Sequence, residues 1–251
     1  MKNPTSTASQ RQPRSEGFTL METVIAIGVL AVLLTGFIAV FTPAAQGIRR
    51  SISSQQADRL ATVLELELVT PRSGQAPATN QSVPTTAITG FQKAFTWIRE
   101  GNTPANAIFV YQYRGNPAAL RSDGTPTPLP TITGQPGKNY VVFSMARRAN
   151  ETTELAADLR AVEGAVFYVI PTQLIYSANG MVPGTAGSIK DPRTGSLVTS
   201  ISAYGDAVIA FSAEFYSIPS KSAAYIQGPQ FATRFTTAKR PVFTRNLAVR
   251  R

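Results

Sequence analysis

The chain has 251 residues, of which 43% are hydrophobic, and its 24 Lys and Arg against 14 Asp and Glu give a formal net charge of +10. This length accommodates one domain of ordinary size beside a membrane helix. Cysteine and histidine are both absent, which excludes disulfide bonds, Ser-His-Asp or Cys-His catalysis, and metal ligation by histidine. A basic surface attracts nucleic acid, anionic lipid or acidic proteins, and net charge does not choose among them.

Residues 1–17 are polar and basic, and we interpret them as a processed leader. They are followed by Gly17-Phe18-Thr19-Leu20-Met21-Glu22 and then by the apolar run 24–41, which holds no charged residue over 18 positions. As an α-helix this run covers about 27 Å, close to the thickness of one hydrocarbon core. We therefore predict a membrane-spanning helix over residues 18–42.

A secretory signal peptide is the competing interpretation of this segment. The apolar run is longer than the usual hydrophobic region of such a peptide, and no convincing small-x-small cleavage site follows it, because Pro43 precedes Ala45 by two positions. Charge alone does not set the orientation. The leader carries three basic residues, and Arg49, Arg50 and Arg59 follow the span.

The junction at Gly17 and Phe18, with an acid at Glu22, resembles the prepilin N-terminus of type IV pilins and type II secretion pseudopilins. The resemblance covers residues 1 to about 70. It implies that a prepilin peptidase cuts after Gly17 and methylates Phe18. It also implies that the leader lies in the cytoplasm and that the remainder lies beyond the bacterial inner membrane. The implied partners are other pilin or pseudopilin subunits, and no cofactor is implied.

Glu22 is the one charged residue within the predicted span 18–42. Residues four apart share a helix face, so after cleavage its carboxylate would lie beside the Phe18 amine, at the favourable end of the helix dipole. The resemblance implies that Glu22 also meets the Phe18 amine of a neighbouring subunit during assembly. An acid tolerated near the membrane surface is the simpler alternative.

Small residues form a stripe on one face of the predicted span. The stripe comprises Gly28, Ala31, Thr35 and Ala39, at spacings of three, four and four residues. Such a stripe lets another helix approach closely and gain van der Waals contact. The ordinary Gly and Ala content of a membrane helix explains the same residues equally well.

The helix is predicted to continue beyond the span. Thr42-Pro43 should kink or loosen it locally. An amphipathic stretch follows over residues 43–70, whose apolar face we expect to lie under a β-sheet, and Pro71 ends it. The residues of this face are Ile48, Ile52, Leu60, Leu64 and Leu68.

Residues 71–251 are predicted to form one β-rich domain after a polar loop at 70–90. Segments dense in Val, Ile, Phe and Tyr are the candidate strands, and one helix is predicted between them, with Asn150 as its N-cap. The candidate strands are 91–99, 107–114, 140–147, 165–176, 207–217 and 241–249. The expected fold class is α+β and pilin-like: a long N-terminal helix packed on an antiparallel sheet.

No pattern in the sequence predicts an enzyme. The acids Glu151, Glu154 and Asp158 lie at helical spacing, where they are explained by a helix N-terminus. The basic C-terminus is the other unusual feature, and it holds Arg234, Lys239, Arg240, Arg245, Arg250 and Arg251. A charged edge strand is our first interpretation of it, an acidic neighbouring subunit the second, and nucleic acid the third.

We therefore expect a structural subunit that is cleaved after Gly17 and assembled through its N-terminal helix into a type IV pilus or type II secretion pseudopilus. Its length and long loops are more typical of a minor or atypical member than of a major pilin. The alternative is a single-span, membrane-anchored binding protein that does not polymerise.

Overall fold

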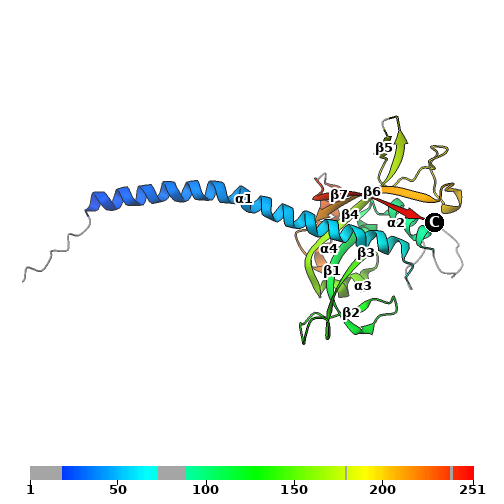
Figure 1. Cartoon of the computed structure of the whole chain (residues 1–251), viewed down its shortest axis with the longest axis horizontal. Coiled ribbons are helices and arrows are strands. Elements are labelled where there is room, and N and C mark those ends of the chain that lie inside the picture. Colours follow the sequence, from blue (N-terminus) through cyan, green and yellow to red (C-terminus); the bar gives the residue numbers. More distant parts are fainter. Residues whose placement is uncertain (1–18, 73–88, 179, 238–239) are drawn as a thin grey trace, which may run out of the picture. The chain divides into compact units, whose positions relative to one another are not determined.

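A computed structural model of the chain describes residues 19–72, 89–178, 180–237 and 240–251 (Figure 1). The predicted leader, with Gly17 and Phe18, lies outside these residues. The chain divides into two compact units, one ending at Arg49 and the other comprising Arg50–Arg251. All the buried residues of the described chain belong to the second unit.

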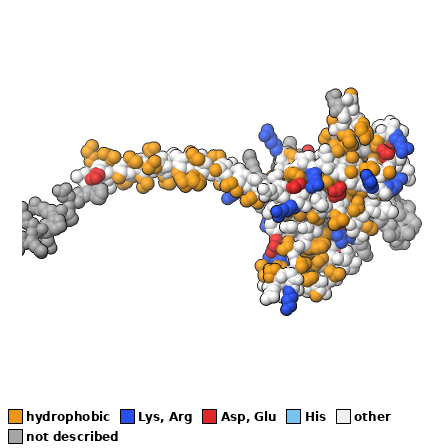
Figure 2. Space-filling model, in the orientation of Figure 1, with side chains coloured by type: hydrophobic (Ala, Val, Ile, Leu, Met, Phe, Trp, Pro, Cys, Tyr) orange, Lys and Arg blue, Asp and Glu red, His pale blue; other side chains and the backbone are white. Residues whose placement is uncertain are grey.

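Helix α1 runs from Leu20 to Val69 and overlaps both predicted segments, 18–42 and 43–70. Its first half is long and apolar enough to cross a membrane, with a mean hydropathy of 2.8 over 18 residues and no buried residue in that window. Figure 2 shows hydrophobic side chains on this half of the helix. Pro43 lies within the helix. Because proline has no N–H to donate, the helix continues there with one hydrogen bond fewer.

The second half of α1 is amphipathic, as the sequence predicts. Leu60, Leu64 and Leu68 are buried, together with alanines on the same face. The prediction is wrong for Ile48 and Ile52, which are exposed. The buried face begins at Ala57. The small side chain of this residue allows the helix to lie close to the sheet.

The second unit is built on a seven-stranded antiparallel sheet in which β2, β1, β4, β6 and β7 follow one another, with β3 also paired to β1 and β5 to β4. Five of the six candidate strands correspond to observed strands. The strands are β1 Ile108–Leu120, β2 Pro126–Pro128, β3 Val141–Arg148, β4 Val162–Ser177, β5 Gly180–Pro183, β6 Val208–Ser217 and β7 Phe243–Arg250. The helical elements are α2 Gly90–Glu100, η1 Pro104–Asn106, α3 Thr152–Leu159, η2 Ile201–Ala203, α4 Ala223–Ile226 and α5 Pro229–Thr236.

The candidate strand 91–99 is wrong, because this segment forms helix α2. Phe91, Phe95 and Ile98 are spaced four and three residues apart, which is a helical period, and all three are buried. Thr89 caps the helix by accepting a hydrogen bond from the N–H of Gln92 at 3.2 Å. The density of aromatic residues suggested a strand, but the spacing decides the structure.

The predicted helix near residue 150 is confirmed as α3, with Leu155 and Leu159 buried. Its N-cap is Glu151 rather than Asn150. The Glu151 carboxylate accepts a hydrogen bond from the N–H of Arg148 at 3.1 Å and so joins the end of β3 to the helix.

Both faces of the sheet are covered, which goes beyond the single helix expected from the sequence. Alternate residues of β1 enter two separate cores. Ile108 and Val110 pack with α1 and α2. Phe109, Tyr111 and Tyr113 pack with α3, α4 and α5 on the opposite face. The fold is therefore α+β, with a sheet held between two helical layers.

A buried cluster of charges joins β3, α3 and the β1–β2 turn. The guanidinium of Arg147, of whose side chain 1% is exposed, contacts Asp158 at 2.7 Å, Asp123 at 2.7 Å and Glu151 at 3.0 Å. The hydroxyl of Tyr111 donates to the same Asp158 oxygen at 2.7 Å, and burial raises the pKa of Tyr111 well above its usual value. Each buried charge thus has partners that offset its desolvation.

We predict that Asp158→Asn destabilises the protein by about 3 kcal/mol, because it leaves buried guanidinium charge undercompensated. Thermal unfolding of the full chain in detergent micelles, followed by near-UV circular dichroism, measures the change. Asp206→Asn is the matched control. Its contact with Arg193 is 3.6 Å long and exposed, so removing it should cost no more than about 1 kcal/mol. Equal effects of the two substitutions would contradict the prediction.

Asp123 should make the free energy of unfolding depend on pH in the acidic range. Burial alone would raise its pKa, but hydrogen bonds from Thr125 and Arg147 outweigh burial and lower the pKa to about 2 from its usual 3.8. Its contribution, about 2 kcal/mol, is therefore present above pH 4 and is lost as the pH falls towards 2. We predict that Asp123→Asn is less stable than the wild type at pH 6 and loses less stability on acidification. Parallel pH profiles of the two proteins would disprove this.

Candidate functional site

The start of helix α1 is organised around Thr19 and Glu22. The Thr19 hydroxyl accepts a hydrogen bond from the N–H of Glu22 at 3.3 Å, and the Thr19 carbonyl accepts one from the N–H of Thr23 at 3.1 Å. This is the arrangement of an N-cap with an acid at the third helical position. Glu22 therefore lies in the first turn, where the helix dipole favours a negative charge.

The Thr-x-x-Glu spacing of Thr19 and Glu22 is the sequence signal for this cap, and it was not among the predictions made from the sequence. It gives Glu22 a local role that is independent of any neighbouring subunit. The predicted pairing of Glu22 with the amine of Phe18 remains a prediction, because Gly17 and Phe18 lie outside the described residues.

The hydroxyl groups within the span are satisfied by the helix itself. Thr35 donates to the carbonyl of Ala31 at 2.8 Å, and Thr42 donates to that of Ile38 at 2.9 Å. A polar group without a partner is costly in hydrocarbon, and such bonds to the preceding turn remove the cost. The threonines within helix α1 up to Thr42 therefore keep their hydroxyl donors bonded to the helix, and Thr23 does the same by donating to the carbonyl of Thr19 at 3.1 Å.

The predicted stripe of Gly28, Ala31, Thr35 and Ala39 is exposed along its whole length. At 3.6 residues per turn these four positions fall within an arc of about 80°. Phe37 and Phe41 lie on the other side of the helix, where their rings stack with centroids 3.9 Å apart. The span therefore has one smooth face and one bulky face, and the smooth face suits close approach of a second helix.

The described residues of the basic C-terminus do not gather into one surface. Arg245 pairs with Asp58 of α1 at 3.2 Å, and Arg234 donates to the carbonyl of Ser217 at 3.2 Å. Arg251 lies over the ring of Phe91, 5.0 Å from its centroid. Arg240 and Arg250 are exposed, and Lys239 lies outside the described residues. Strand β7, which carries Arg245 and Arg250, is last in the strand order, as the edge-strand interpretation requires.

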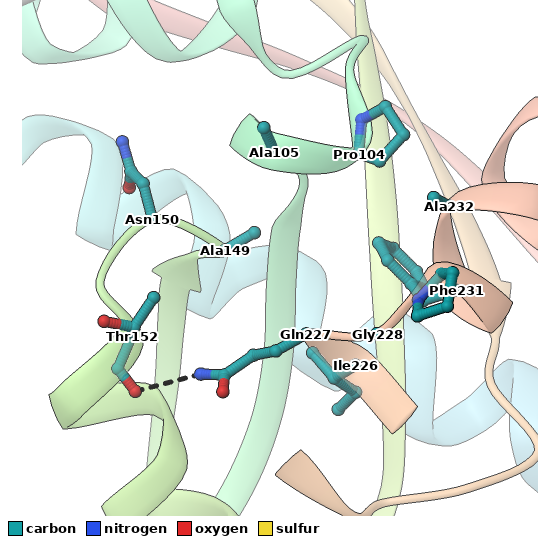
Figure 3. A pocket seen from close by; sticks show the side chains of 11 residues that line it. Pro104, Ala105, Ala149, Asn150, Thr152, Ile226, Gln227, Gly228, Phe231 and Ala232 are labelled. Carbon is teal, nitrogen blue, oxygen red and sulfur yellow. Dashed lines mark hydrogen bonds between the residues drawn. The ribbon is translucent and has the colours of Figure 1, made fainter. Parts of the chain in front are cut away.

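The second unit has an open groove of 580 Å³ between η1, the β3–α3 connection and α4–α5 (Figure 3). Its lining is mainly apolar and includes Pro104, Ile226 and Phe231. The side-chain amide of Gln227 crosses it to donate to the carbonyl of Thr152 at 3.1 Å. No acidic or basic side chain lines the groove, so it lacks ionisable groups for proton transfer.

Within the described ranges, no group of three or more acidic residues could hold a metal ion. Comparisons of the chain with family models, with curated proteins and with solved structures find no match. The interpretation of the N-terminal segment therefore depends on its residues and their geometry.

Proposed function

We propose that this chain is a structural pilin-like subunit, which a prepilin peptidase cuts after Gly17 and which assembles through α1 into a type IV pilus or type II secretion pseudopilus. The observation that carries the proposal is the helix after Glu22. It is charge-free over residues 24–41, it is exposed, and it leads into a second unit that contains its own core. An anchor and a separate folded body in one chain are what a filament subunit of this kind requires.

Assembly exchanges lipid for protein around the span. Lipid tails are as apolar as Leu, so the hydrophobic effect provides little drive for helices to associate within a bilayer. Van der Waals packing and polar contacts must decide the exchange instead. The stripe from Gly28 to Ala39 offers the packing surface, and the charge of Glu22 offers the polar contact.

In this scheme, the charge of Glu22 sets the relative position of neighbouring helices. A carboxylate within a membrane costs a few kcal/mol, and less near a helix end. Pairing with an amine at the start of a neighbouring helix would recover that cost at one relative position of the two helices only. The free subunit keeps the charge tolerable by placing it in the first turn of α1.

A single-span binding protein that does not polymerise is the second candidate. The observation that favours it is the apolar groove beside Phe231, which a ligand could enter. The two candidates differ in one observable property: only a filament subunit is recovered in sheared fibres.

We predict that Glu22→Ala leaves the protein inserted in the membrane and cleaved but reduces its recovery in sheared fibres at least tenfold. The expected loss equals about 1.4 kcal/mol or more of subunit contact. The measurement is immunoblotting of the membrane and sheared-fibre fractions from cells that express each variant.

Glu22→Gln separates the two roles of this side chain. Glutamine suits the third helical position beside a Thr cap as well as glutamate does, but it carries no charge. We expect Glu22→Gln to be excluded from fibres as strongly as Glu22→Ala. Normal incorporation of the glutamine variant would show that capping alone matters, and normal incorporation of both variants would refute the assembly role.

A further inference from the structure

Four strands of the sheet, β2, β3, β5 and β7, each pair with a single neighbouring strand. The outer side of such an edge strand presents N–H and C=O groups that no other strand uses, and a strand from another chain can pair with them. Proteins commonly protect these edges with prolines, with very short strands or with covering groups. The four edges of this sheet differ in how far they are protected.

Three of the edges are short or partly covered. Strand β2 has three residues, and two of them, Pro126 and Pro128, have no N–H to donate. Strand β5 has only four residues. In β3 the outer N–H of Arg148 donates to the Glu151 carboxylate at 3.1 Å. Ala146, two residues earlier, directs its backbone to the same side and is fully buried. These edges therefore offer little to a partner.

Strand β7 is the open edge. The N–H of Arg251 donates to the carbonyl of Ala207, which lies opposite it in the register of β6 and β7, at 2.8 Å. Every second residue before Arg251 therefore bonds to β6, because bonded and unbonded pairs alternate in antiparallel strands. The residues between them direct their N–H and C=O groups away from β6. These residues are Thr244, Asn246, Ala248 and Arg250. All four are exposed, and no backbone group elsewhere in the described ranges bonds to theirs.

The middle of β7 presents no free charge to a partner. Arg245 is held by Asp58 of α1 at 3.2 Å, and Leu247 and Val249 are buried in the core. Arg250, at the end of the strand, is exposed and forms no salt bridge with any residue that the structure describes. An added strand would therefore meet uncharged residues along the middle of β7 and one positive charge at its end.

The charge of β7 also indicates which kind of strand fits it. Opposite charges on neighbouring strands stabilise a sheet, and like charges destabilise it. An acidic residue is therefore favoured beside Arg250. The four edge strands of this chain contain no acid, and their only charged residues are Arg147, Arg148, Arg245 and Arg250. A second copy of this chain thus has no matching edge, and the matching strand belongs to a different protein.

We propose that β7 binds an extended, acid-bearing strand of a different subunit in the same filament. The added strand pairs with the backbone of Asn246 and Ala248 and places an acid beside Arg250. In this form of recognition, main-chain hydrogen bonds provide affinity and side chains provide specificity. The proposal rests on the filament role given above, and it names a partner for the folded unit rather than for the N-terminal helix.

The test uses the full chain in cells that assemble the filament, with immunoblotting of the membrane and sheared-fibre fractions. Ala248→Pro removes an outward N–H but leaves the bonds between β7 and β6, since proline is tolerated on the open side of an edge strand. We expect its recovery in fibres to fall at least fivefold, or by about 1 kcal/mol, the value of one hydrogen bond. Ala248→Val keeps the N–H and suits a strand, so its recovery should stay within about twofold of the wild type.

Arg250→Glu tests the charge without changing the backbone. It opposes the partner's acid with a second acid, so we expect recovery in fibres to fall at least about fivefold. Lys190→Glu makes the same change of charge at an exposed position outside the edge strands and should leave recovery within about twofold, because distant surface charges are screened. Near-UV circular dichroism of each variant in detergent micelles checks the fold. If Ala248→Pro unfolds, Arg250→Glu decides the outcome.

Photo-cross-linking identifies the partner. A photoreactive benzoylphenylalanine in place of Asn246 should cross-link to a different protein through a segment that contains Asp or Glu, and Ala248→Pro should abolish this adduct. The same group in place of Ser196, an exposed loop residue, should not form it.

Three results would overturn the proposal and leave the filament role intact. They are equal recovery of the proline and valine variants in fibres, normal recovery of Arg250→Glu, and an adduct that consists of two copies of this chain. Absence of the wild type from sheared fibres would overturn both the proposal and the filament role.

Discussion

The apolar surface of residues 24–41 is the constraint on which the rest of the molecule depends. It contains no charged residue, and every described residue of the first unit, from Thr19 to Arg49, is exposed. Water cannot solvate such a surface without a large free-energy cost, so lipid or other helices must cover it. The helix meets this requirement internally by satisfying its own backbone and by returning the hydroxyls of Thr35 and Thr42 to preceding carbonyls. Glu22 at the start of α1 is the exception, and its position in the first turn limits its cost.

The second unit is stabilised without disulfides, as the absence of cysteine requires. Two apolar cores lie on the two faces of the sheet, and buried charges connect the elements at their margins. Glu67, near the end of α1, accepts hydrogen bonds from Lys93 of α2 and from Arg72. Burial lowers the pKa of Lys93, while the neighbouring Glu67 carboxylate opposes that shift. This contact joins the last turns of α1 to α2.

The sequence predicted the features that depend on local periodicity and composition. The long apolar helix, five strands and α3 follow from them, and so does the burial of Leu60, Leu64 and Leu68. The helical period of α2 was visible, but aromatic density suggested a strand.

Features that depend on long-range packing were not predictable. Examples are the second helical layer formed by α4 and α5, and the pairing of Arg147 with Asp123 and Asp158, which come from three distant segments. The C-terminal arginines also show why composition is insufficient: Arg245 and Arg251 are used within the fold, which a charge count does not reveal.

The central proposal is that the mature chain begins at Phe18 and that its N-terminal helix leaves the bilayer for a bundle of similar helices. Intact-mass and N-terminal peptide mass spectrometry of the protein from cell envelopes tests this most directly. The account predicts a mature chain that lacks residues 1–17 and carries a methylated amine on Phe18. A mature envelope protein that still retains the first 17 residues would contradict it.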